Sequence, residues 1–146
     1  MRSPKAFTLP EVLIVIGILA ILAVIVILAV DPVARFENAR DARRLSDTQA
    51  MTSALHQYVI DHKGVFPDGL DATERQIGTA RSGCALTTRQ CAVQGDQDCL
   101  DLTSALTPYL HGIPSDPKNG NDGLTHYSVR VGPDNALLVE ACDLSE

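Results

Sequence analysis

One carboxylate in this sequence stands where a charge is costly. Glu11 lies in an apolar stretch at residues 7–30, FTLPEVLIVIGILAILAVIVILAV, which follows a short basic leader. A carboxylate at membrane depth costs about 2.5–3.5 kcal/mol on insertion scales, so it requires a partner or contact with water. Glu11 lies near the edge of the stretch, where a solvated interfacial position is one interpretation. A specific cationic partner is the functional alternative.

Four cysteines, all after the apolar stretch, are the next candidates for chemistry. They are Cys84, Cys91, Cys99 and Cys142. An even number beyond a membrane segment predicts two disulfides in an oxidising compartment, with reduced thiols packed in a core as the alternative. Zinc is less favoured because no C-x-x-C pair is present. Of three possible pairings we favour Cys91–Cys99, which closes a short loop, and Cys84–Cys142, which ties the last strand back.

An acidic, amide-rich segment, SDPKNGNDG at residues 115–123, could bind calcium through side-chain oxygens. The candidate ligands are Asp116, Asn119, Asn121 and Asp122. The EF-hand pattern is incomplete, because no glutamate stands at its twelfth position. A plain polar turn is therefore the favoured interpretation, with calcium as the weaker alternative and no other cofactor expected.

The remaining residue types give no sign of catalysis. The sequence has no nucleophile motif, phosphate loop or pair of catalytic carboxylates. Its four histidines lie in separate segments without metal-ligand spacing, and each is interpreted as a surface or packed histidine. They are His56, His62, His111 and His126. An enzyme is not expected.

Charge and length exclude further classes. The 146 residues carry a formal net charge of −6, and residues 45–146 hold 14 acidic against 6 basic side chains. A basic face that contacts nucleic acid is therefore not expected. The part that follows the apolar stretch suffices for one small domain, not for a multidomain enzyme.

The apolar stretch itself predicts a transmembrane helix. Residues 12–30 are uncharged and free of proline, and at about 1.5 Å per residue they cover roughly 29 Å, close to the hydrocarbon thickness. A cleavable secretory signal has a shorter apolar core and a small-residue cleavage site after it, so this helix should stay on the mature protein.

A second helical segment should follow up to residue 63. Asp31 and Pro32 either cap a new helix or kink a continuous one. An apolar stripe at helical spacing should carry the globular domain, and the Lys63-Gly64 pair should end the helix. The stripe comprises Leu45, Thr48, Met51, Ala54, Leu55, Tyr58, Val59 and His62.

The rest of the chain predicts an α+β head. Residues 64–98 have weak periodicity and are expected to form a long loop held by its cysteines. A short helix is expected over residues 100–111. Two strands, at 125–131 and 136–142, should then form a small antiparallel sheet on which the long N-terminal helix packs.

The N-terminal residues KAFTLPEVL, 5–13, resemble the class III signal of type IV prepilins and of the pseudopilins of type II secretion. The resemblance implies a cut between Ala6 and Phe7, N-methylation of Phe7, and Glu11 as fifth residue of the mature chain. Ala6 replaces the usual glycine and Pro10 a commoner branched or polar residue. A proline costs little in the first helical turn.

Two later segments are similar to major pseudopilins and related pilins. SALHQYVIDHKGVFP, residues 53–67, contains the turn that ends the long helix in that family. LTPYLHGIPSDPKNG, residues 106–120, contains a P-x-D-P loop that precedes the sheet, and calcium binds in the corresponding region of major pseudopilins. Residues 68–98 have no counterpart.

The resemblance implies four parts: a leader at 1–6, a transmembrane and filament-core helix at 7–30, its amphipathic half at 31–63, and a disulfide-containing head at 64–146. It also implies a homo-oligomeric type IV pilus-like filament in which Glu11 pairs with the Phe7 amine of a neighbour. Other implied partners are a prepilin peptidase and the assembly machinery. The alternatives are a major pseudopilin and a solitary signal-anchored binding domain outside the cytoplasm.

The implied location is the inner membrane with the head outside the cytoplasm, and then an extracellular or periplasmic filament. The positive-inside rule opposes this orientation. It counts two cationic side chains before the span, Arg2 and Lys5, and four soon after it. We give the leader motif precedence over that count.

Overall fold

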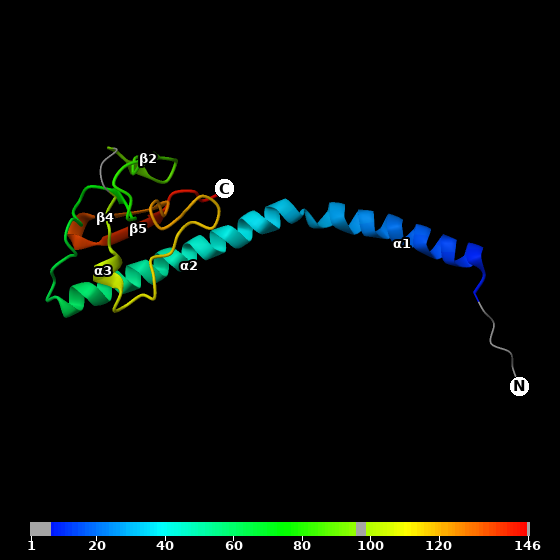
Figure 1. Cartoon of the computed structure of the whole chain (residues 1–146), viewed down its shortest axis with the longest axis horizontal. Helices are drawn as coiled ribbons and strands as arrows, with labels where there is room; N and C mark the ends of the chain where they lie inside the picture. The colour runs from blue at the N-terminus through cyan, green and yellow to red at the C-terminus, as the bar shows by residue number, and fades with distance from the viewer. Residues whose placement is uncertain (1–6, 96–98, 146) are drawn as a thin grey trace, which may run out of the picture. The chain divides into compact units, whose positions relative to one another are not determined.

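The computed structural model describes residues 7–95 and 99–145 (Figure 1). The chain divides into two compact units, residues 1–37 and residues 38–146. The described part of the first unit is mainly helical, and the second contains most of a second helix, a small antiparallel sheet and their connections. The α+β class predicted from the sequence is confirmed.

Helix α1, Leu9–Val30, is the apolar element. Its large apolar side chains are 49–78% exposed in the single chain, from Val12 to Leu28. Residues Leu9–Ala29 are long and apolar enough to cross a membrane. At about 1.5 Å per residue they extend roughly 32 Å, which matches the hydrocarbon core of a bilayer.

Asp31 separates α1 from helix α2, Pro32–Asp61. It adopts left-handed backbone angles (φ 41°), which end α1. Its carboxylate Oδ1 accepts the amide of Ala34 at 3.4 Å, and Pro32 occupies the first helical position, where no amide is needed. Of the two arrangements that the sequence allowed here, the chain takes the restart.

Helix α2 ends in two interlocking backbone hydrogen bonds. Gly64 N–H donates to the carbonyl of Val59 at 2.8 Å, and Lys63 N–H donates to that of Ile60 at 3.2 Å. This is the Schellman pattern, with Lys63 (φ 58°) as the left-handed residue and Gly64 (φ 89°) following it. The stop near residue 63 is confirmed, with Asp61 as the last residue of the helix.

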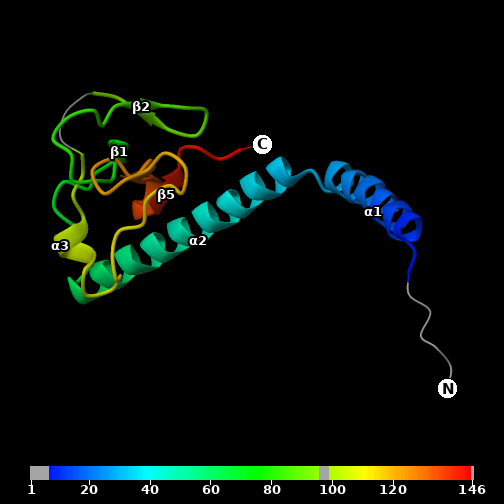
Figure 2. The ribbon, with the colours of Figure 1, turned by 45° about the vertical axis from the view of Figure 1, so that its right-hand side comes forward.

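The main sheet has three antiparallel strands in the order β1 (Arg75–Gln76), β4 (Tyr127–Val131) and β5 (Leu137–Ala141). Its central register places Val129 opposite Val139. A 3-10 turn, η1 (Pro133–Asn135), connects β4 to β5. A separate hairpin joins β2 (Leu86–Thr87) to β3 (Ala92–Val93). Both views show the main sheet between α2 and this hairpin (Figure 1, Figure 2).

Two sequence predictions about the connections are wrong in extent. The segment 64–98 was expected to be a loop, but it contributes β1 to the main sheet and the whole hairpin. Two-residue strands are too short to produce a periodic pattern. The helix expected over 100–111 is only α3, Thr103–Leu106. Pro108, which has no amide to donate, stands two residues after its end.

The core of the second unit forms where α2 meets the sheet. Met51, Ala54 and Leu55 of α2 are buried together with Tyr127 and Val129 of β4. Complete burial of a side chain such as Leu55 contributes about 1.5–3 kcal/mol. The predicted stripe is correct from Met51 to Val59, whereas its last member, His62, is exposed. Its first member, Leu45, is 59% exposed and does not join this core.

Two disulfides tie the connections to the sheet, and their pairing differs from the one that we favoured. The bonds are Cys84–Cys99 and Cys91–Cys142. Cys99 N–H donates to the carbonyl of Ala80 at 2.9 Å, which brings Cys99 beside the segment that carries Cys84. The sulfur of Cys91 lies 3.2 Å from Ser128 Oγ on the sheet, so it reaches the end of β5. These long-range contacts leave no sequence signal.

We predict that the two disulfides contribute unequally to stability. They span 15 residues (Cys84–Cys99) and 51 residues (Cys91–Cys142). In the chain-entropy model these loops correspond to about 3 and about 4 kcal/mol. Paired alanine replacement should therefore lower the free energy of unfolding more at Cys91/Cys142 than at Cys84/Cys99, as measured by guanidinium titration of the full chain in detergent. A larger loss of stability at Cys84/Cys99 than at Cys91/Cys142 would contradict the chain-entropy account.

Candidate functional site

Glu11 lies at the third position of α1, one turn from Thr8. Its Oε2 accepts the Thr8 amide at 3.4 Å and the Thr8 hydroxyl at 3.5 Å. Thr8 and Glu11 thus form the T-x-x-E pattern of a capping box, a signal that our sequence analysis overlooked. Both bonds are long, so the carboxylate is only loosely held by its own helix.

The other residues of the predicted N-terminal site differ in what the structure describes. Phe7 precedes α1 and is 80% exposed. Ala6, on the other side of the predicted cut, lies outside the described residues. Cleavage, N-methylation and pairing of Glu11 with a neighbour stay predictions.

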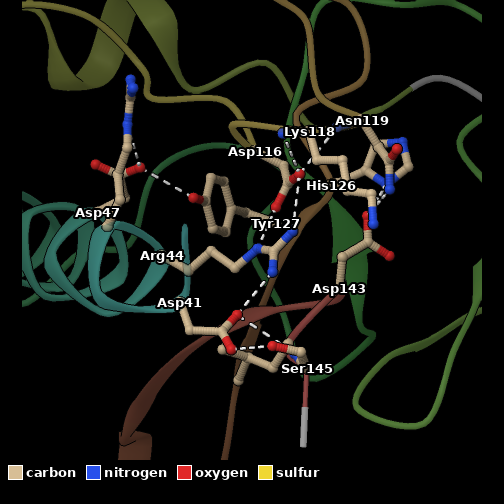
Figure 3. Close-up of polar contacts among 12 residues, drawn as sticks. Asp41, Arg44, Asp47, Asp116, Lys118, Asn119, His126, Tyr127, Asp143 and Ser145 are labelled. Atoms are coloured by element: carbon tan, nitrogen blue, oxygen red, sulfur yellow. Dashed lines mark hydrogen bonds and ion pairs between the residues drawn. The ribbon is translucent and has the colours of Figure 1, made fainter. Parts of the chain in front are cut away.

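Arg44 of α2 is a buried charge of the second unit, with 1% of its surface exposed. Its Nε and Nη2 donate to the two carboxylate oxygens of Asp116 at 2.5 and 3.2 Å, and its Nη1 donates to Asp41 at 2.7 Å. Figure 3 shows the guanidinium between these two carboxylates. A bidentate pair of this kind fixes orientation as well as distance. It fastens the loop before β4 to α2.

Burial and hydrogen bonding act in opposite directions on Asp116. Burial alone would raise its pKa, but the hydrogen bonds from Arg44 and from the Asn119 and Lys118 amides outweigh it, so the pKa of this carboxyl lies below its ordinary 3.8. The hydrogen bond to Asp116 also raises the pKa of Arg44 further above its ordinary value. Both groups are therefore charged at neutral pH.

The C-terminal segment, residues 142–145, is attached to the rest of the unit by a disulfide and by hydrogen bonds. Cys142 is in a disulfide, and Asp143 Oδ2 accepts Asn119 Nδ2 at 2.9 Å and contacts His126 Nδ1 at 2.8 Å. Ser145 donates its amide (3.3 Å) and its hydroxyl to Asp41. The tail therefore closes over the first part of α2 that belongs to this unit, through the same carboxylate that contacts Arg44 (Figure 3).

Of the four calcium candidates, Asp116 and Asn121 have side-chain oxygens that already accept hydrogen bonds. Asp116 binds Arg44, and its Oδ1 also accepts the amides of Lys118 and Asn119 at 2.9 Å each. Asn121 Oδ1 accepts the amides at positions 123 and 124, and the carbonyl of Asp122 accepts Thr79 N–H at 3.2 Å. This is the bonding of a polar turn. Calcium binding stays a prediction, and it would compete with the guanidinium for Asp116.

One further group of ligand-type atoms occurs among the described residues. Atoms of Glu74, Cys91 and Glu140 lie within 4.8 Å of one another. Cys91 is bonded to Cys142, so it cannot supply the thiolate that a metal site requires. The group is therefore no metal centre as it stands.

Arg44 was not predicted as a site residue from the sequence, where it is only one of the charges that follow the membrane segment. A signal was present: Arg44 stands seven residues before Met51, on the extension of the buried stripe of α2. A cation in line with such a stripe must meet a carboxylate if it is buried. The sequence could not show which carboxylate, because Asp116 lies 72 residues away.

Residues 1–27 match the family model described as the prokaryotic N-terminal methylation motif. This signal is typical of type IV pilins and pseudopilins, and the match confirms the resemblance over the N-terminal part of the chain. No curated protein and no solved structure matched the chain.

We predict that the Arg44–Asp116 pair makes stability depend on pH only in acid. Because the pKa of Asp116 is lowered on folding, its contribution is full above about pH 4 and is lost as the pH falls through the lower, folded value. Asp116→Asn should cost about 3–5 kcal/mol at pH 7, since it takes from buried Arg44 one of the two carboxylates that pair with it, Asp41 being the other. Denaturant titration at several pH values would measure this difference, which should shrink below pH 4.

The exposed carboxylate Asp68 provides the matched control. Asp68→Asn removes the same charge and should change the free energy of unfolding little at any of these pH values. An Asp116→Asn penalty that stayed constant into strong acid would show that the pair does not carry the pH dependence.

Proposed function

We propose that this protein is a structural subunit of a type IV pilus-like filament that polymerises through α1. The observation that carries the proposal is the coincidence of the methylation motif at residues 1–27 with a helix that exposes large apolar side chains along its whole length. Exposure of this extent requires a membrane or the packing of other copies. The same helix can be stored in the inner membrane and then buried in a filament core.

Glu11 gives the apolar packing a preferred register. Two apolar helices can pack at many axial offsets with similar free energy, because few contacts distinguish one offset from another. After cleavage, the new amine of Phe7 is a cation at the start of the helix, and Glu11 of a neighbour can pair with it. A buried charge without a partner is expensive, so offsets that separate the two groups are disfavoured. The long bonds to Thr8 leave Glu11 available for this exchange.

The head supports a location outside the cytoplasm. Its two disulfides form in oxidising compartments. The disulfides of the four cysteines hold the segments around the hairpin against the sheet. Such cross-links suit a filament that is exposed outside the cell. On this ground we favour a surface pilus. The GVFP and PSDP segments, residues 64–67 and 114–117, support the second candidate, a major pseudopilin of type II secretion.

A solitary signal-anchored binding domain is the alternative from another class. It would keep its leader and remain monomeric in detergent, whereas a pilin loses its leader and assembles. We propose no catalytic role and no cofactor. The proposed partners are further copies of the chain, a prepilin peptidase and the assembly machinery.

We predict that the native protein begins at Phe7. Removal of the leader at Ala6 and methylation of the new amine should give an N-terminal peptide that starts with a singly methylated phenylalanine. Mass spectrometry of the protein from its native membranes would detect this peptide. An intact N-terminus would favour the signal-anchored domain.

We predict that Glu11→Ala separates membrane insertion from assembly. Insertion should be unchanged or improved, because removal of an unpaired carboxylate lowers the cost of burial by about 2.5–3.5 kcal/mol at most. Filament yield, measured by electron microscopy of sheared or membrane fractions, should fall at least tenfold. A matched variant, Thr8→Ala, removes only the local cap and should assemble. Normal filaments from Glu11→Ala would refute the register role.

A further inference from the structure

Polar side chains gather on the face of the main sheet that lies toward the hairpin (Figure 2). In the register of the sheet, Ser128 pairs with Gln76 on one side and with Glu140 on the other. Directly opposite residues of antiparallel strands have their side chains on the same face. Glu74, two residues before Gln76, shares this face by the alternation of a strand. Cys91 Sγ lies 3.2 Å from Ser128 Oγ, so both glutamates are brought to this sulfur.

Four side chains of metal-ligand type meet at this place. Ligand atoms of Glu74, Cys91 and Glu140 lie within 4.8 Å of one another. Cys142, which is bonded to Cys91, adds a second sulfur. Both cysteines are buried, each with 1% of its surface exposed, and both glutamates are partly buried. Two sulfurs and two carboxylate oxygens form a donor set that zinc accepts, provided that the sulfurs are thiolates.

Glu74 has an oxygen that calls for a cation. Its Oε2 accepts the amide of Ala92 at 3.2 Å, which ties the carboxylate to the start of β3. Its Oε1 is buried and has no hydrogen-bond partner among the described residues. A buried carboxylate oxygen in this state is costly. The cation of Arg130 lies toward the other glutamate, with Nη2 at 3.9 Å from Glu140 Oε1, the limit of an ion pair.

We propose that this group becomes a zinc site when the Cys91–Cys142 disulfide is reduced. The two thiolates and the carboxylates of Glu74 and Glu140 hold the ion. Zinc lies about 2.3 Å from sulfur and about 2.0–2.2 Å from oxygen, so a shift of about 1 Å in the glutamate side chains closes the group around it. Arg130 offsets part of the surplus negative charge. The inference is independent of the proposed filament, and the zinc is structural rather than a cofactor.

The disulfide and the zinc site interconvert by a balanced exchange. A dithiol passes two electrons and two protons to the sulfurs of Cys91 and Cys142, and it closes to a cyclic disulfide. Zn²⁺ then displaces the two protons, because the thiolate is the form that binds metal. Oxidation of the thiolates reverses the exchange and releases the ion. The connection between the hairpin and the end of β5 is therefore a disulfide in oxidising surroundings and a zinc bridge in reducing ones.

Zinc titration of the full-length chain in detergent tests the site. A phosphine is the reductant, because a dithiol would itself bind zinc. It takes an oxygen from water to become the phosphine oxide and leaves two protonated thiols. The reduced chain should bind one zinc ion, at least a hundredfold more tightly than the oxidised chain, and Co²⁺ in place of zinc should give a thiolate charge-transfer band. Equal affinity of the two forms would overturn the site.

Glutamate variants separate this site from zinc that is bound by thiols alone. Glu74→Gln and Glu140→Gln keep the size of the side chain, and each should weaken zinc binding by the reduced chain at least tenfold. The matched control Glu37→Gln, in the other unit, should bind as wild type does. Should reduction unfold the head, zinc would meet only thiols. Both glutamate variants would then match wild type, and that result would overturn the proposal.

Protection from alkylation identifies the thiols that hold the ion. In the reduced chain, zinc should slow the labelling of Cys91 and Cys142 by iodoacetamide at least tenfold, as measured by mass spectrometry of peptides. Labelling of Cys84 and Cys99 should not change, and their paired replacement by alanine should leave the zinc affinity as in wild type. Equal protection of all four cysteines, or loss of zinc binding in the paired variant, would overturn the assignment.

Discussion

The buried guanidinium of Arg44 is the interaction on which the head depends. Arg44 is the point where three parts of the chain meet: α2 supplies the cation, the loop before β4 supplies Asp116, and the tail arrives at Asp41 through Ser145. A buried ion pair adds little net stability over apolar residues of similar volume, but loss of one partner is costly. The network therefore acts mainly by making one arrangement of loop and tail far better than any other.

The N-terminal helix α1 lacks a polar network of this kind. In α1 nearly everything is apolar, so packing is favourable in many arrangements and specific in few. Glu11 is the exception, and its local bonds to Thr8 are too long to satisfy it fully. In the filament that we propose, the two units use the same principle in different settings. A charge that must be paired selects one geometry where hydrophobic contact alone would accept several.

The sequence predicted the features that repeat locally and missed those that depend on distant contacts. The length of α1, the buried face of α2 from Met51 to Val59, and strands β4 and β5 all follow from periodicity, whereas capping allowed the restart at Asp31 only as one of two arrangements. The two-residue strand β1 has no period, and the disulfide pairing depends on where the hairpin lies on the sheet. Of the candidate sites, the N-terminal motif was visible as a contiguous pattern, whereas Arg44 and Asp116 are joined across 72 residues.

The attachment of the tail to α2 imposes an order on biosynthesis. Asp41 leaves the ribosome 104 residues before Ser145, and Cys91 leaves 51 residues before Cys142. The early half of the head must therefore wait for residues 142–145 before the tail can close over it. Contacts of such long sequence separation form slowly. Should the segment containing α1 enter the bilayer during synthesis, the nascent chain would be tethered there before its head could close.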